Sequence, residues 1–135
     1  MLMSSKVVGV GTLKEGSYII IDGEPCKIVS LEKSKPGKHG AAKARIVAMG
    51  LFDGVKRSII KPVDAKIEVP VVNKRVGQVI SLRPLMIMDL ENPEICFETE
   101  MPEEEELASK ITEGVQVEYW DILGRKKIVR VKSTV

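Results

Sequence analysis

The chain alternates short runs of apolar and β-branched residues with turn sequences. Four such runs precede Pro62, at residues 17–21, 27–33, 44–52 and 55–61. Asp22-Gly23 and Asp53-Gly54 close the first and third runs. Asp-Gly between apolar runs is typical of a tight hairpin, because glycine tolerates a positive φ. Short strands at this regular spacing predict a small barrel of the SH3-like type over the first ~65 residues.

A different order of elements follows. The pattern predicts strands over residues 71–82, 85–90 and 95–100, then a helix, then strands over residues 115–123 and 126–132 that are joined by a turn at Gly124. The helix is expected over residues 103–111. Pro102 would open it, the acids at 103–106 suit the positive end of its dipole, and Gly114 would end it.

Three strands, a helix and two strands is the order of an OB-fold. The sequence therefore predicts an all-β protein with one short helix. It would consist of an SH3-like barrel at residues 1–69 and an OB-fold at residues 70–135. Only 4% of the residues are aromatic, so we expect the cores to be packed mainly by Val and Ile.

The two halves differ in charge. Residues 1–70 carry 12 Lys and Arg against 7 Asp and Glu, a net charge of +5, whereas residues 71–135 carry 9 against 12, a net charge of −3. The first half is therefore the one expected to contact phosphate groups.

Several classes of site and location are disfavoured by composition. Cys26 and Cys96 lack metal-ligand spacing and His39 is the single histidine, so we expect no metal site. We found no catalytic arrangement and no phosphate-binding glycine loop, so we expect neither an enzyme nor a cofactor. Both cysteines are expected to be buried apolar residues in a reducing, cytoplasmic compartment. No apolar run approaches the ~20 residues of a membrane span, and the N-terminus does not read as a signal peptide.

The segment 33–45, KSKPGKHGAAKAR, has four lysines, one arginine and no acid, and lies between two predicted strands. Residues 35–38 fit a type II turn, because Pro36 presets φ at the second position and Gly37 takes the positive φ at the third. The expectation is a protruding hairpin tip that carries Lys38 and His39. A basic protrusion without acids suits an anionic target. The alternative is a solvated loop that only keeps the barrel soluble.

This segment resembles the modification loop of the translation initiation factor 5A family, the archaeal and eukaryotic relatives of bacterial elongation factor P. The resemblance covers essentially the whole chain, including VPVVNKR at residues 69–75. It implies that Lys38 receives an aminobutyl group from spermidine and becomes deoxyhypusine or, after hydroxylation, hypusine. Pro36 stands where many members have Thr, and Ala41 where many have a polar residue or His.

The resemblance further implies a ribosome-binding factor of the cytoplasm that promotes peptide-bond formation at stalled sites, with modified Lys38 reaching toward the peptidyl-tRNA. The expected partners are ribosomal RNA, tRNA and deoxyhypusine synthase, and no membrane. The residues of the RNA-contacting loop would be Lys33, Lys35, Pro36, Gly37, His39, Gly40, Lys43 and Arg45. Two alternatives remain: a general RNA- or DNA-binding adaptor with an unmodified basic loop, and an interaction protein that uses its acidic half.

Three other features have simpler interpretations. Tyr119 and Trp120 are neighbours in a predicted strand, so at most one faces the core, and core packing is favoured over a base-stacking platform. The acids at 103–106 are expected to be the first turn of a helix rather than a metal site. The basic residues 125–127 are expected to be a solvated turn, with a second RNA contact as the alternative.

Overall fold

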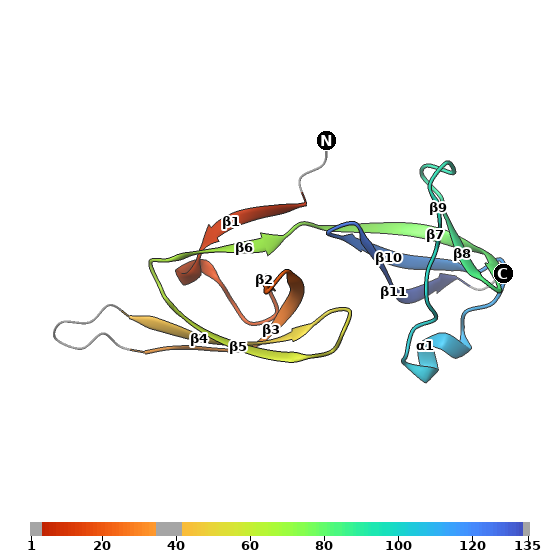
Figure 1. Cartoon of the computed structure of the whole chain (residues 1–135). Coiled ribbons are helices and arrows are strands. Elements are labelled where there is room, and N and C mark those ends of the chain that lie inside the picture. Colours follow the sequence, from red (N-terminus) through yellow and green to blue (C-terminus); the bar gives the residue numbers. More distant parts are fainter. Residues whose placement is uncertain (1–3, 35–41, 134–135) are drawn as a thin grey trace. The chain divides into compact units, whose positions relative to one another are not determined.

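The computed structural model describes residues 4–34 and 42–133, and within them the chain is built almost entirely from β-strands (Figure 1). The chain divides into two compact units, Met1–Val71 and Val72–Val135. Each unit has its own cluster of buried apolar side chains. One short α-helix is present in the described residues, which confirms the predicted fold class.

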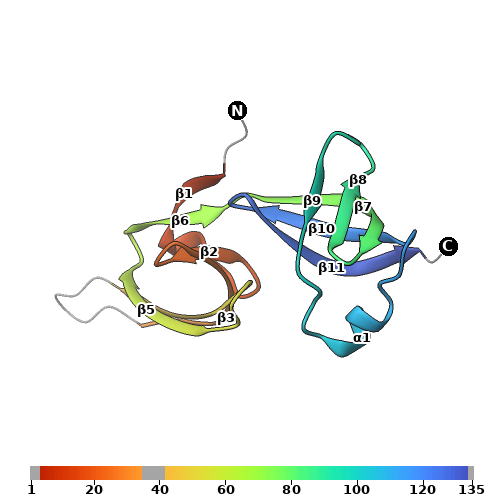
Figure 2. The ribbon, with the colours of Figure 1, turned by 45° about the vertical axis from the view of Figure 1, so that its right-hand side comes forward.

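The first unit contains a four-stranded antiparallel sheet and a two-stranded ribbon. The sheet runs in the order β2 (Tyr18–Ile21), β3 (Glu24–Lys33), β4 (Lys43–Gly50) and β5 (Lys56–Pro62). The ribbon pairs β1 (Ser5–Gly9) with β6 (Lys66–Pro70), and a 3-10 turn, η1 (Val10–Thr12), follows β1. The sheet curls around the core, and the ribbon lies across it (Figure 2). This is the predicted SH3-like barrel.

Strict alternation along β4 places one face in the core. Ala44, Ile46 and Ala48 are buried, while Lys43 and Arg45 are exposed. A strand turns successive side chains to opposite faces, so apolar residues two apart share the buried side. The buried cluster of this unit holds only aliphatic residues and Cys26, as the low aromatic content predicts.

Asp22 and Gly23 form the tight turn between β2 and β3, with φ values of 51° and 78°. Positive φ at both positions is the requirement of a type I′ hairpin, which confirms this turn. The connection at Asp53-Gly54 differs from the prediction. β4 ends at Gly50 rather than Phe52, and the link to β5 spans residues 51–55. The Asp53 carboxylate there accepts a hydrogen bond from the Val55 N–H and pairs with Arg57 at 2.8 Å.

The ribbon was not predicted. Ser5 pairs with Pro70 and Gly9 with Lys66, in a ladder that joins the two ends of the unit. β6 does alternate, with Ile67 and Val69 buried between exposed Lys66 and Glu68, but it is only five residues long, and β1 shows no such alternation. Their pairing is a property of the tertiary fold, which local pattern does not report.

The second unit is a five-stranded antiparallel sheet with one helix. Its elements are β7 (Val72–Leu82), β8 (Leu85–Asp89), β9 (Cys96–Glu98), α1 (Glu105–Ser109), β10 (Gln116–Ile122) and β11 (Arg125–Ser133). The strand order in the sheet is β11-β10-β7-β8-β9. The predicted order of three strands, a helix and two strands is confirmed, as is the OB-fold.

The helix is shorter than predicted. It begins after Glu104 and ends at Ser109, so Pro102 lies outside it, and Gly114 belongs to the turn that precedes β10. Ile111 is buried and donates its N–H to Ala108 in a three-residue turn, which diverts the chain toward the core. The prediction for Cys96 was also wrong. Cys26 is buried, but Cys96 is exposed because β9 is a short edge strand that turns Phe97 inward.

Candidate functional site

The candidate site is the hairpin formed by β3 and β4. Lys33 at the end of β3 pairs with Ala44 near the start of β4. Both strands are central in the sheet, since β2 flanks β3 and β5 flanks β4. Six predicted site residues lie outside the described residues, and their predictions stay untested: Lys35, Pro36, Gly37, Lys38, His39 and Gly40.

Ser34 and Lys43 close the hairpin where the described strands end. The Ser34 N–H donates to the Lys43 carbonyl at 2.8 Å. The Ser34 hydroxyl donates to the same carbonyl and accepts the Lys43 N–H, both at 3.2 Å. Three hydrogen bonds between these two residues fix the two strand ends to each other.

Lys43 and Arg45 lie on the outer face of β4, and both are exposed. In the ladder, Arg45 lies directly opposite Glu32 on β3 and Ile60 on β5. Glu32 precedes the acid-free segment, and the sequence alone does not show that it lies beside Arg45. A carboxylate opposite a guanidinium offsets part of its charge. Lys43 lies opposite Pro62 on β5, which is not an acid.

Lys33 has a specific partner within the barrel. Its ammonium donates to the carbonyl oxygen of Gly11, in the 3-10 turn η1, at 2.9 Å. The sequence places these residues far apart, and nothing in the local pattern signals the contact. Lys33 therefore has a structural role in addition to any contact with RNA.

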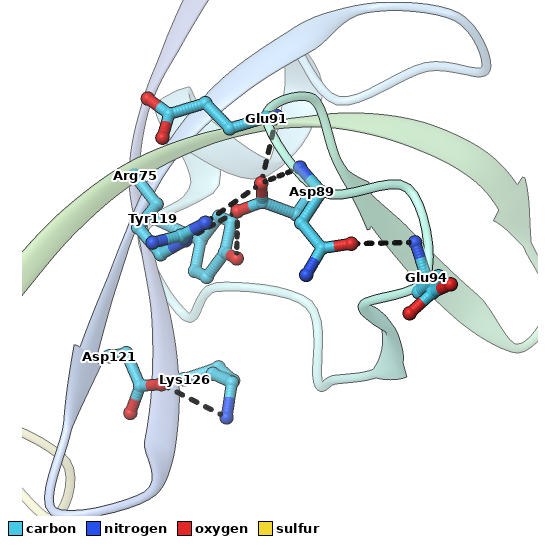
Figure 3. Close-up of polar contacts among 8 residues, drawn as sticks. Arg75, Asp89, Glu91, Glu94, Tyr119, Asp121 and Lys126 are labelled. Carbon is cyan, nitrogen blue, oxygen red and sulfur yellow. Dashed lines mark hydrogen bonds and ion pairs between the residues drawn. The ribbon is translucent and has the colours of Figure 1, made fainter. Parts of the chain in front are cut away.

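The second unit contains a buried polar network that sequence reasoning missed. The carboxylate of Asp89, fully buried at the end of β8, accepts hydrogen bonds from the Arg75 guanidinium at 2.6 and 3.1 Å and from the Tyr119 hydroxyl at 2.6 Å (Figure 3). The N–H groups of Glu91 and Asn92 each donate to it at 2.9 Å. Five donors satisfy one carboxylate, so the network joins β7, β8 and β10 and fixes the turn after β8.

The network shifts the pKa values of its members in opposite directions. Hydrogen bonds from Arg75 hold the pKa of Asp89 well below its usual range, although burial opposes this. Burial, together with the nearby carboxylate, raises the pKa of Tyr119 far above its usual value. Asp89 is therefore an anion and Tyr119 a neutral donor at every pH in the physiological range, an arrangement that suits a structural anchor.

Tyr119 and Trp120 divide between two faces, as predicted. Tyr119 is buried and its ring lies 4.9 Å from that of Phe97, centroid to centroid. Trp120 is half-buried, and the Lys74 ammonium lies 5.1 Å from its ring centroid. The basic residues 125–127 open β11 directly after the turn. Lys126 pairs with Asp121 at 3.4 Å, so this cluster is partly neutralised (Figure 3).

Two features are absent from the described residues. These residues contain no group of three or more His, Cys, Asp or Glu side chains that could hold a metal ion. The helix within the described range is too short to cross a membrane. Of the acids at 103–106, Glu105 and Glu106 lie in the first turn of α1, whereas Glu104 is its N-cap and Glu103 precedes it, so the prediction of a first turn was wrong for those two.

Comparison with known proteins gives consistent results. A family model described as "Translation initiation factor 5A-like, N-terminal" matches residues 4–65. The translation initiation factor 5A of Metallosphaera sedula is 57% identical over 125 residues, covering 91% of this chain and 95% of that protein. That of Thermofilum pendens is 53% identical, covering 97% of this chain and 100% of the relative. The solved eukaryotic translation initiation factor 5A from Methanococcus jannaschii matches with a TM-score of 0.87 at 42% identity, covering 98% of this chain and 100% of that one.

Proposed function

The chain belongs to the translation initiation factor 5A family, and on this premise we propose that it binds the ribosome and promotes peptide-bond formation at stalled sites through a modified Lys38. The modification would be deoxyhypusine or hypusine. The observation that carries the proposal is the acid-free basic segment 33–45, with Lys38 between Gly37 and His39-Gly40, on the hairpin of a chain from this family.

The chemistry of lysine supports the modification. Its side chain is a primary amine on a flexible four-carbon stem, which can act as a nucleophile when deprotonated. A bond forms between the lysine nitrogen and the terminal carbon of the aminobutyl group of spermidine, the bond from that carbon to the secondary nitrogen of spermidine breaks, and the three-carbon diamine that retains this nitrogen is released with the proton lost by the lysine amine. The product roughly doubles the reach of the lysine, keeps positive charge and adds a donor. Such an arm can enter a narrow cavity lined by phosphate that a whole domain cannot enter.

The geometry of the hairpin base supports presentation of this arm. β4 is held by a ladder on each side, β3 by β4 along its length and by β2 over residues 24–27, and Ser34 and Lys43 close the ends of the hairpin. Lys43 and Arg45 add positive charge on the outer face of the same hairpin. This charge would attract ribosomal RNA and tRNA without reading sequence.

The proposal assigns different roles to the ribosome and to this protein. Relatives of the chain are named as translation factors, and the family implies involvement with the ribosome. In the proposal, the ribosome's RNA performs the chemistry, and this protein supplies positioning and charge near the peptidyl-tRNA in the cytoplasm. Deoxyhypusine synthase is the proposed modifying partner, and spermidine the source of the group.

Intact-mass measurement of the protein from its native source tests the proposal. The expected result is the mass of an aminobutyl group, with or without one oxygen, which peptide mapping places on Lys38. Protein made in a host without the synthase is the control and should carry the plain mass. An unmodified Lys38 in the native protein would contradict the proposal and favour the RNA-binding adaptor.

A further inference from the structure

Strand β5 has a free edge. It ends the four-stranded sheet of the first unit, and among the described residues it pairs with β4 alone (Figure 1). The ladder between the two strands is regular, with no bulge from the pair of Lys43 and Pro62 to the pair of Met49 and Lys56. A strand at the end of a sheet presents N–H and C=O groups that have no strand partner. β5 is therefore an edge that can accept a further strand.

The hydrogen bonds at both ends of this ladder show which backbone groups of β5 face outward. Val63, just after β5, donates its N–H to the Ala42 carbonyl at 3.0 Å. Val55, just before β5, accepts the Gly50 N–H at 2.9 Å. Hydrogen-bonded pairs alternate with non-hydrogen-bonded pairs along an antiparallel ladder, so the odd-numbered residues of β5 bond to β4. The N–H and C=O groups that face outward belong to Lys56, Ser58 and Ile60.

An apolar groove of about 350 Å³ lies beside this edge, between β5 and the strands β2 and β6. Ile59 of β5 lines one side, and Ile20 and Ile67 line the other. Val7 of β1 also lines the groove and is 59% exposed. Proteins bind extended peptides where an unpaired strand edge adjoins apolar pockets, because alternate side chains of the added strand can enter them. The groove therefore suits the apolar side chains of an added strand.

The charge along the edge indicates the class of occupant. β5 contains Lys56, Arg57 and Lys61 but no acid. Arg57 is neutralised by Asp53, whereas the ammonium groups of the two lysines form no ion pair or hydrogen bond within residues 4–34 and 42–133. Opposite charges on neighbouring strands of a sheet stabilise their pairing. An added strand with acidic side chains would thus find unpaired cations beside it.

The two sides of an added strand would meet different surroundings. Ile59 turns toward the groove, so side chains on that side of the added strand would enter it. Side chains on the other side would lie beside Lys56, on the exposed outer face of the sheet. The acids of the groove, Asp22 and Glu68, are on its opposite wall. A segment that alternates apolar residues, facing the groove, with acids, facing outward, therefore complements the edge.

Two other occupants complement the edge less well. A second copy that paired through its own β5 would bring the lysines of both chains to one short edge, where like charges repel. RNA would meet an apolar groove with two acids on its wall, which offers a phosphate backbone little attraction.

We propose that the free edge of β5 is a docking site for an extended acidic segment of another protein, which adds a strand along residues 56–60 and places alternate apolar side chains in the groove. This docking site goes beyond the proposed function. It uses no residue of the basic segment 33–45 and does not depend on the modification of Lys38.

Amide hydrogen exchange of the full chain with a synthetic peptide tests the proposal. The probe is an acetylated seven-residue peptide of alternating Glu and Val that begins and ends with Glu, and amide chemical shifts report its occupancy. When about one tenth of the protein remains free, exchange of the Ser58 and Ile60 N–H groups should slow about tenfold, because exchange then requires the free form. The Arg57 and Ile59 N–H groups already bond to β4, so they are the internal reference and should change little.

Control peptides and variants separate strand addition from attraction by net charge. A peptide with Lys in place of Glu, and one with Ser in place of Val, should each bind several-fold less tightly than the Glu-Val peptide. Lys56→Glu should weaken binding of the Glu-Val peptide several-fold. Lys14→Glu is the matched variant, because Lys14 is exposed in the same unit, does not line the groove, and gives the same change in net charge. It should bind the peptide nearly as wild type does.

Unchanged exchange of Ser58 and Ile60 at millimolar peptide would overturn the proposal. Equal binding of the Glu-Val and Glu-Ser peptides, or equal losses in Lys56→Glu and Lys14→Glu, would also overturn it, since either result means attraction by charge alone. Protection of the same two N–H groups that rises with protein concentration, without peptide, would assign the edge to a second copy instead. Protection by a uridine octamer but not by the peptide would assign it to RNA, and each of these two results would likewise overturn the proposal.

Discussion

The hydroxyl of Tyr119 donates a hydrogen bond of 2.6 Å to the carboxylate of Asp89, and both side chains are fully buried. The bond joins β10 to the end of β8 inside the second unit. We expect Tyr119→Phe to lower the free energy of unfolding by about 1–2 kcal/mol, because Asp89 keeps its other donors but loses one. Urea unfolding followed by Trp120 fluorescence measures this. A variant with the same free energy of unfolding as wild type would show that this hydrogen bond contributes no net stability.

Asp89→Asn should be more damaging and should change the response to pH. Loss of the carboxylate leaves Arg75 without its anion, which costs about 3 kcal/mol at neutral pH. The folded pKa of Asp89 is lowered, so its stabilisation is complete above the unfolded value near pH 4 and declines as pH falls below it. The stability difference between wild type and Asp89→Asn should therefore shrink below about pH 4. A difference that is constant from pH 7 to pH 3 would contradict this assignment.

The two cysteines should differ in reactivity. Cys96 is exposed and Cys26 fully buried, where burial raises the pKa of the Cys26 thiol. The thiolate is the reactive form, so a thiol reagent should label one group in the native protein and the second only after unfolding. Cys96→Ser should abolish the fast phase. Rapid labelling of Cys26 in the native state would mean that the first barrel opens readily.

Lys38→Arg separates modification from charge. The substitution keeps the positive charge and nearly the length, but a guanidinium does not accept the aminobutyl group as a primary amine does. We expect loss of activity on stalling-prone messages with the fold and most of the salt-dependent binding retained. The factor is made together with the synthase so that wild type is modified. Full activity of Lys38→Arg would falsify the proposed function.

Arg45 should contribute less to ribosome binding than Lys43. Both are exposed on the outer face of β4, but Arg45 lies opposite Glu32 in the ladder. We expect a few-fold weaker binding for Lys43→Ala, a smaller loss for Arg45→Ala, and a decline of both effects at high salt. Glu32→Gln tests the cause, because it should strengthen the contribution of Arg45. Equal losses in both variants would show that Glu32 has no influence.

The sequence predicts what depends on local pattern. Alternation in residues 44–48 and the Asp22-Gly23 turn predict the hairpins, and the order of strands and helix predicts the OB-fold. The ribbon of β1 and β6 was missed because each strand acquires its identity from a partner about sixty residues away. α1 was overestimated because the position of Ile111 is decided by the core rather than by helix propensity.

The same distinction applies to the site. Composition and the Pro-Gly turn signal identify the basic segment and Lys38 within it. The partners of its base do not follow from composition, because Lys33 meets Gly11 only after the barrel closes. Asp89 offers one local signal, because the sequence Asp89-Leu90-Glu91-Asn92-Pro93 at a strand end is typical of a turn that an Asp side chain caps. Its bonds to Arg75 and Tyr119 come from strands distant in sequence and could not be predicted.

The pairing of Ser5 with Pro70 has a consequence for biosynthesis. While a ribosome makes this chain, β1 emerges first but has no ladder partner until β6 has been translated and has left the exit tunnel. Closure of so long a loop costs chain entropy before any contact compensates for it, so the nascent first barrel should fold late and as one step. The hydrogen bond from the Gly11 N–H to the Val63 carbonyl should form in that same step, because Gly11 follows β1 and Val63 precedes β6 by a few residues.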